Sequence, residues 1–180
     1  QKLTAKIKQE LQQLYMDKAV FKIEITATTD FYANGMDQVR FLIAPNPGEE
    51  LKPLVKIASG GEQSRIVLAL KVIFGQSTSV ETMIFDEIDT GVSGRVASAI
   101  GAKMRELAKK KQVLTITHSP QVAALATQRY LIVKEVRDNR TYSSVQELDL
   151  EESVEAIARM LSGNELSQAS LDNARELLKK

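Results

Sequence analysis

Cysteine is absent from the sequence, which excludes disulfide bonds and thiolate metal sites. No apolar run approaches the ~20 residues that a membrane helix needs, and the first residues show no signal-peptide pattern. An excess of charge of one sign is missing too. The formal net charge is +1, so a general electrostatic attraction to nucleic acid is not expected of this chain alone. We therefore expect no membrane association and a reducing, cytoplasmic location.

The composition is that of a folded domain rather than a disordered segment, because 43% of the 180 residues are hydrophobic and 26% are charged. A chain of this size buries roughly 70% of its unfolded surface, so one domain with a real core is expected. Because the first residue is Gln1 rather than methionine, we expect the chain to be a piece of a longer protein.

Residues 1–18 have the apolar spacing of a helix, with Leu3, Ile7, Leu11 and Leu14 on one narrow seam. Two interpretations are open. The segment is either a surface helix packed on this domain or the end of a coiled coil that enters from elsewhere. Two heptads fall short of the three to four that establish a coiled coil.

The rest of the chain alternates between strand-like and helix-like segments. The expected strands are 20–28, 38–44, 83–85, 113–117, 130–136 and 141–148, with turns at Asn34-Gly35 and Asp138-Asn139. Helices are expected to begin at Ser59, Val92, Ser119-Pro120, Asp149 (with Glu152 in a capping box and Gly163 as the end) and Glu165. The strand–helix–strand order in the middle predicts parallel strands with right-handed crossovers. We therefore expect an α/β fold with a mostly parallel sheet flanked by helices.

The strand at 83–85 ends in two adjacent carboxylates, Asp86 and Glu87. Ligands of parallel sheets gather at the carboxyl ends of the strands. One carboxylate there can hold hydrated Mg²⁺, which keeps most of its waters, and its neighbour can take a proton from a water molecule. The ordinary alternative is a strand that runs out into a polar turn.

Ser59, Gly60, Gly61 and Glu62 open the next long apolar helix. Ser-x-x-Glu is a capping box, which explains a helix start without any ligand. The same segment also leaves free amides at a helix N-terminus beside two glycines, which is an arrangement that binds anions. A plain capping box does not need two glycines in its first turn, where each costs ~1 kcal/mol of helix propensity. We therefore favour phosphate binding.

His118 is the chain's only histidine, and it follows the expected strand 113–117. This places it at the same sheet edge as Glu87, where it can contact a γ-phosphate or orient an attacking water. The ordinary alternative is a packed or surface side chain. Asp89 is either a turn former before Thr90-Gly91 or a carboxylate that touches a partner across an interface.

Together these segments resemble the ATP-binding-cassette ATPase head. Four of its motifs have counterparts in this sequence, namely the signature motif at 58–65, Walker B at 83–87, the D-loop at 88–91 and the switch-histidine segment at 116–118. The wording Ser-Gly-Gly-Glu-x-Ser-Arg, Phe-Asp-Glu-Ile-Asp-Thr-Gly and Thr-His-Ser-Pro is closer still to the SMC-like ATPases of bacterial DNA repair. Glu62 and Ala58, where transporters usually have Gln and Leu, disfavour a transporter.

The resemblance implies a role for each matched residue. Asp86 would help to hold Mg²⁺ through water, Glu87 would be the general base, and His118 would contact the γ-phosphate of ATP. Ser59 to Glu62 would grip ATP that is bound by a second head, and Asp89 would lie at the interface between the two heads.

The resemblance also implies which parts lie elsewhere. No Gly-x-x-x-x-Gly-Lys-Ser/Thr loop occurs in the sequence, so the phosphate-binding Walker A loop and the Q-loop would belong to an amino-terminal lobe of the same protein. Residues 1–18 would then be the end of the connecting coiled coil, and 19–180 the carboxy-terminal lobe. The implied function is ATP-dependent homodimerisation and ATP hydrolysis in double-strand-break repair and recombination, with DNA bound by the full-length protein at the bacterial nucleoid. The alternatives are the head of another SMC-like or transporter ATPase, and a non-catalytic dimerisation module.

Overall fold

A computed structural model describes residues 1–33, 35–57, 59–75, 79–92, 94–163 and 165–179. Asn34 of the predicted turn and Ala58 of the signature segment lie outside these residues. The chain divides into two compact units. Unit 1 comprises Gln1–Met83 and Ile88–Val92, and unit 2 comprises Ile84–Glu87 and Ser93–Lys180.

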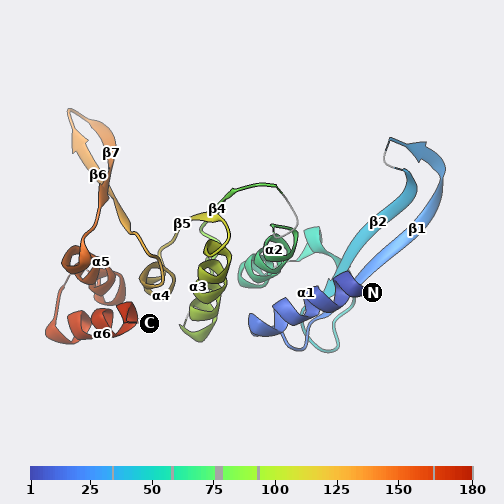
Figure 1. The fold of residues 1–180 in the computed structure, drawn as a ribbon, viewed down its shortest axis with the longest axis horizontal. Coiled ribbons are helices and arrows are strands. Elements are labelled where there is room, and N and C mark those ends of the chain that lie inside the picture. Colours follow the sequence, from blue (N-terminus) through green and yellow to red (C-terminus); the bar gives the residue numbers. More distant parts are fainter. Residues whose placement is uncertain (34, 58, 76–78, 93, 164, 180) are drawn as a thin grey trace. The chain divides into compact units, whose positions relative to one another are not determined.

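The described part of unit 1 contains a long antiparallel hairpin, with helices before and after it in the sequence (Figure 1). Its elements are α1 (Lys2–Gln13), β1 (Val20–Tyr32), β2 (Gly35–Ala44), β3 (Lys52–Pro53), the 3-10 helix η1 (Leu54–Lys56) and α2 (Gly60–Gly75). β1 pairs with β2 from Val20 opposite Ala44, and the register shifts between Ala27 and Tyr32. The two strands are longer than predicted, because backbone pairing continues along the hairpin beyond the buried residues near its base.

α1 packs against α2 and β1 within unit 1. Ile7, Leu11 and Leu14 of its apolar seam are fully buried. The helix ends at Gln13, earlier than predicted, because Tyr15 takes the left-handed conformation (φ 59°) that terminates helices. The apolar seam therefore has a packing role inside unit 1, and its origin in a coiled coil stays a prediction.

Unit 2 receives the end of β4 (Thr82–Asp86) and the elements that follow it. These are α3 (Gly94–Ala108), β5 (Gln112–Ile116), α4 (Pro120–Ala124), β6 (Tyr130–Arg137), β7 (Arg140–Glu147), α5 (Leu150–Ser162) and α6 (Gln168–Leu178). β4 pairs with β5, and β6 pairs with β7 in an antiparallel hairpin. Asp138 and Asn139 form its turn, both with positive φ, as the sequence predicts.

The α/β fold class is confirmed, but the expectation of a mostly parallel sheet needs correction. The β1–β2–β3 and β6–β7 sheets are antiparallel. Short connections join these strands, whereas a parallel pair needs a crossover of a dozen or more residues. Among the described strands, the helix-connected pair β4 and β5 is the one to which the crossover argument applies.

The ends of α5 follow their local sequence signals. The backbone N–H of Glu152 donates to Asp149 Oδ1 and that of Asp149 donates to Glu152 Oε2, both at 2.9 Å, which is the predicted capping box. Gly163 ends the helix with φ 78°. α6 begins later than predicted, because Ser167 and Ser170 form a second capping box.

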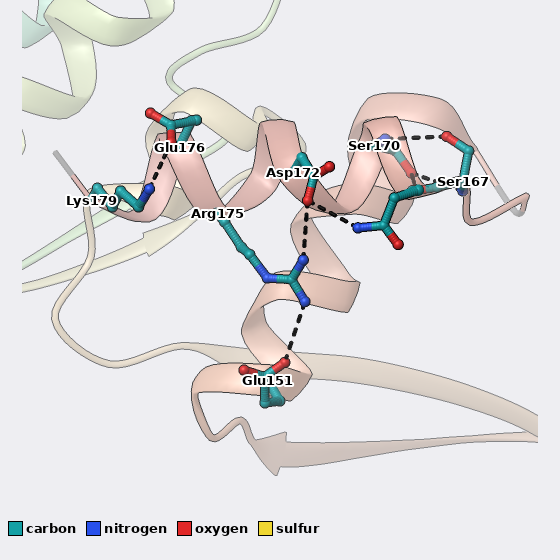
Figure 2. A network of polar contacts seen from close by, with 8 residues as sticks. Glu151, Ser167, Ser170, Asp172, Arg175, Glu176 and Lys179 are labelled. Carbon is teal, nitrogen blue, oxygen red and sulfur yellow. Dashed lines mark hydrogen bonds and ion pairs between the residues drawn. The ribbon is translucent and has the colours of Figure 1, made fainter.

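α5 and α6 pack on each other through a small apolar core, to which they contribute Val154, Ile157, Ala158 and Ala174. Figure 2 shows polar contacts within α6 and between α6 and α5. Arg175 of α6 contacts Asp172 at 3.2 Å and reaches Glu151 of α5 at 3.9 Å. No helix among the described residues combines the length and apolar character that crossing a bilayer requires.

Candidate nucleotide-binding site

Unit 2 brings the end of β4 next to the end of β5. The backbone N–H of Glu87 donates a hydrogen bond to the carbonyl oxygen of Ile116 at 3.0 Å. Asp86 is the last residue of β4, and His118 stands two positions after Ile116. The three side chains proposed for the site therefore follow the same end of the β4–β5 pair, and all three are exposed.

The backbone is strained at Glu87, which has φ 45°. This left-handed conformation is uncommon for residues other than glycine and costs about 1–3 kcal/mol, so it persists only where the surroundings enforce it. The bond from Glu87 to Ile116 is one such restraint. Strain of this kind clusters at functional sites. At Glu87 it lies on the residue that the sequence singles out as the general base.

The turn after His118 is also restrained. The backbone N–H of Ser119 donates to Thr117 Oγ1 at 2.9 Å, and the Ser119 hydroxyl donates to Gln121 Oε1 at 3.0 Å. Ser119 then serves as the N-cap residue of α4, with Pro120 in its first turn as predicted. His118 thus lies between the end of a strand and the start of a helix, both of which limit its backbone.

Unit 1 holds the signature segment and the D-loop. A Cβ atom added to Gly61 would lie 2.8 Å from the carbonyl oxygen of Gly91 and 3.3 Å from Val92 Cγ1. Packing against the D-loop therefore requires glycine at position 61. A Cβ atom added to Gly60 would meet no atom within 4 Å. The chain's own packing thus gives no reason for glycine at position 60, which leaves that backbone open to a ligand.

Asn46 is a residue of this region that the sequence did not single out. Its Nδ2 donates to Glu62 Oε1 at 3.2 Å and to Glu49 Oε1 at 3.0 Å. The carboxylate of Glu62 is thus held by a side chain from the loop after β2. The carbonyl of Ser59 accepts the backbone N–H of Gln63 at 2.9 Å, which fixes the first turn of α2.

Asp89 is fully buried in unit 1, and its carbonyl accepts the N–H of Val92 at 3.3 Å. A contact across an interface needs an exposed carboxylate, whereas a turn former does not. In the chain by itself Asp89 is therefore a turn residue, and its contact with a second head stays a prediction.

Arg65 is a second residue to which the sequence gave no role. Its Nε donates to the carbonyl of Gly61 at 3.0 Å, and its Nη1 donates to the carbonyls of Leu14 and Tyr15, each at 3.2 Å. Partial burial lowers the pKa of Arg65 below its ordinary value, and the nearby Glu62 carboxylate opposes this effect. The sequence places Arg65 three residues after Glu62 of the signature motif, but it does not show that Arg65 contacts the end of α1.

The donor set of unit 2 fits a hydrated Mg²⁺ and little more. Among the described residues no group of three or more Asp, Glu, His or Cys side chains could hold a metal ion. The adjacent carboxylates Asp86 and Glu87 match an ion that keeps several waters and takes one or two carboxylates. An open hollow of about 520 Å³ lies elsewhere, between the β6–β7 hairpin and α5, and contains none of the predicted site residues.

Comparison with known proteins gives a consistent result. No family model matches the chain. It is 48% identical over 180 residues to DNA repair protein RecN of Halalkalibacterium halodurans, which is 98% of this chain and 32% of that protein. It is 45% identical over 193 residues to RecN of Bacillus subtilis (99% and 34%) and 40% identical over 173 residues to RecN of Vibrio cholerae (96% and 31%). The chain thus spans about a third of the length of the curated relatives it matches.

Solved structures agree on the fold. The Smc head domain with a coiled coil from Pyrococcus yayanosii superposes with a TM-score of 0.67 at 18% identity, covering 89% of this chain and 29% of that one. A chain from a study of ATP-driven dimerization and DNA-stimulated activation of SMC ATPases gives 0.60 at 18% identity, covering 89% and 91%. At this identity the likeness establishes the fold alone, which is that of part of an Smc head domain.

Proposed function

We propose that this chain is the carboxy-terminal lobe of a RecN-type ATPase head. Nearly all of the chain aligns with RecN, and the aligned part is about a third of RecN's length. In this proposal the lobe hydrolyses ATP only together with an amino-terminal lobe that supplies the phosphate-binding loop. The full-length protein acts in DNA double-strand-break repair and recombination in the bacterial cytoplasm, at the nucleoid.

The juxtaposition of Glu87 with the end of β5 carries the proposal. Glu87 is the general base that takes a proton from the attacking water, and His118, after the same sheet end, contacts the γ-phosphate of ATP. Asp86 would help to hold a hydrated Mg²⁺, which keeps most of its waters. The ion supplies neutralisation of the phosphate charge when it is bound.

The tip of α2 acts on the nucleotide of a second head. Ser59 and Gly60 are exposed at the start of a helix of 16 residues, whose N-terminus favours anions through its free amides and its dipole. The open space beside Gly60 supports a close approach of phosphate to the backbone. Glu62 shapes this tip, and Asp89 lies in the loop that packs behind it. ATP is thus bound between two copies of the head, which makes the functional unit a homodimer.

An uncovered apolar face in unit 2 supports a partner lobe. Three apolar side chains on these strands are exposed: Ile84 of β4 (60%) and Leu114 and Ile116 of β5 (47% and 45%). Phe85, the residue after Ile84 in β4, is buried. Successive residues of a strand point to opposite faces. Each strand therefore has one open face, and its alternate residues are less exposed, with Phe85 buried in β4 and Val113 and Thr115 half-buried in β5. The amino-terminal lobe is the occupant that we propose for the open face.

The decisive experiment measures ATP hydrolysis by this chain alone, by the chain mixed with the amino-terminal lobe, and by the full-length protein. We expect hydrolysis at background level by the chain alone and clear turnover in the other two samples. Robust turnover by the isolated chain would overturn the proposal. ATP-dependent association without turnover in the full-length protein would instead identify a non-catalytic dimerisation module.

A further inference from the structure

One side chain connects the end of α1 with the tip of α2. The guanidinium of Arg65 donates to the carbonyls of Leu14 and Tyr15 just beyond α1, and its Nε donates to the carbonyl of Gly61 in the first turn of α2. Both helices belong to unit 1. The bonds of 3.0–3.2 Å therefore join segments that are about fifty residues apart in the sequence.

The contact of Arg65 with the end of α1 is energetically favourable. The last carbonyls of a helix lack intrahelical partners and carry partial negative charge, so a guanidinium beside them is favourable. Leu14 is fully buried, and the backbone reverses at Tyr15, which has φ 59°. A buried anchor and a reversed chain leave the end of α1 little freedom to move away from Arg65.

The contact also continues past α2. Gly61, which accepts from Arg65, is in close contact with Gly91 and Val92 of the D-loop. A continuous series of contacts therefore runs from the end of α1 through Arg65 to Gly61 and on to Gly91. Every member of this series lies in unit 1.

We propose that Arg65 is a positioning residue, which holds the nucleotide-gripping tip of α2 in a fixed position relative to the end of α1. Productive sites require their groups to be held within about 0.5 Å, and Gly60 and Gly61 give the first turn of α2 more backbone freedom than other residues would. Arg65, one turn further along α2, joins this turn to the end of α1. This inference rests on the proposed function, because the tip matters only where ATP is bound between two heads.

The test uses the full-length protein with Arg65→Ala and Arg65→Lys. Nucleotide binding to the monomer, ATP-dependent association and kcat are measured for each variant. We expect Arg65→Ala to weaken association by about tenfold and to lower kcat, while the monomer's affinity for ATP is unchanged, because the tip acts on the second head's nucleotide. Arg65→Lys keeps the charge but loses the fork, so it should recover only part of the association.

Arg129→Ala is the matched control. Arg129 in unit 2 also donates to three carbonyls near the end of a helix, those of Ala123, Ala124 and Ala126, and burial likewise lowers its pKa. We expect Arg129→Ala and Arg65→Ala to lower the melting temperature by similar amounts, whereas ATP-dependent association should be retained in Arg129→Ala. If Arg65→Ala fails to fold, Arg65→Lys carries the test.

The outcomes separate the two proposals. Normal association and kcat in both Arg65 variants would overturn the positioning role and leave the proposed function standing. A complete absence of ATP-dependent association in the unaltered protein would overturn the proposed function and this inference with it.

Discussion

The backbone N–H of Glu87 and the carbonyl of Ile116 form a 3.0 Å hydrogen bond that places the end of β4 beside the end of β5. His118 lies two residues after Ile116, so it follows the same end of the β4–β5 pair. The bond also restrains the left-handed conformation of Glu87. In the general-base role that we propose for Glu87, this restraint means that the backbone position does not have to be reached anew in each turnover.

Neutralising Glu87 should separate chemistry from binding. In the full-length protein, Glu87→Gln is expected to slow ATP hydrolysis by about 10²–10⁴, the usual contribution of a general base, and to leave the affinity for ATP within a few-fold of the original. The measurements are single-turnover hydrolysis and nucleotide binding at equilibrium. Loss of ATP binding would instead give Glu87 a structural role.

Asp138→Asn is the matched control for that experiment. Asp138 is another acidic residue with positive φ (50°), in the turn between β6 and β7. Asparagine tolerates this conformation well. The change removes one negative charge from a strained turn outside the site, so hydrolysis should stay unchanged.

The two glycines of the signature segment should respond differently to alanine. Gly61→Ala places a methyl group 2.8 Å from the carbonyl oxygen of Gly91, and we expect it to lower the free energy of unfolding by about 1–3 kcal/mol. Gly60→Ala meets no atom within 4 Å and should be neutral or stabilising by up to about 1 kcal/mol. Denaturant unfolding of both variants checks this difference. Equal losses in the free energy of unfolding would show that packing does not require glycine at position 61.

Gly60→Ala has a second expected effect. If phosphate approaches the backbone at this position, the added methyl group should weaken ATP-dependent association of the full-length protein even though the fold is intact. Unchanged association in a stable Gly60→Ala protein would count against the gripping role of the tip.

Local signals in the sequence predicted local structure well. The Asp149 and Glu152 capping box, the Gly163 helix end and the Asp138-Asn139 turn all occur where they were expected. Each depends on residues within a few positions of one another, so its energetics are contained in a short stretch of sequence. The spacing of strand ends also placed Glu87 and His118 at one sheet edge, because sheet topology brings strand ends together.

Features that depend on distant contacts were not predicted. The bonds from Arg65 to Leu14 and from Asn46 to Glu62 join segments whose proximity follows only from the packing of unit 1. The burial of Asp89 is of the same kind. The turns at Asn34-Gly35 and Asp138-Asn139 did predict the two hairpins, whose strands are antiparallel. The expectation of a mostly parallel sheet was wrong because the strand–helix–strand order of the middle of the chain was taken as typical of the whole.

The capping box of α5 and the surface ion pairs of α6 should differ in their effect on stability. Asp149→Ala leaves the N–H of Glu152 without its capping oxygen, and we expect a loss of about 1 kcal/mol. Arg175→Ala removes contacts to Asp172 and Glu151, all with exposed side chains, so the expected loss is below about 0.5 kcal/mol. Thermal unfolding at equal salt compares the two, and a larger loss for Arg175→Ala would contradict this ranking.

The open face of β4 and β5 gives the sharpest test of an incomplete head. Leu114→Glu changes a side chain that is already 47% exposed, so the isolated chain should keep its melting temperature. Against a partner lobe, however, the carboxylate would be buried without a counter-charge, which costs several kcal/mol. Co-purification of the two lobes as separate chains should therefore fall at least about tenfold. Val55→Glu, at an exposed position of unit 1, is the control and should not reduce recovery. Undiminished co-purification of Leu114→Glu would show that the amino-terminal lobe docks elsewhere.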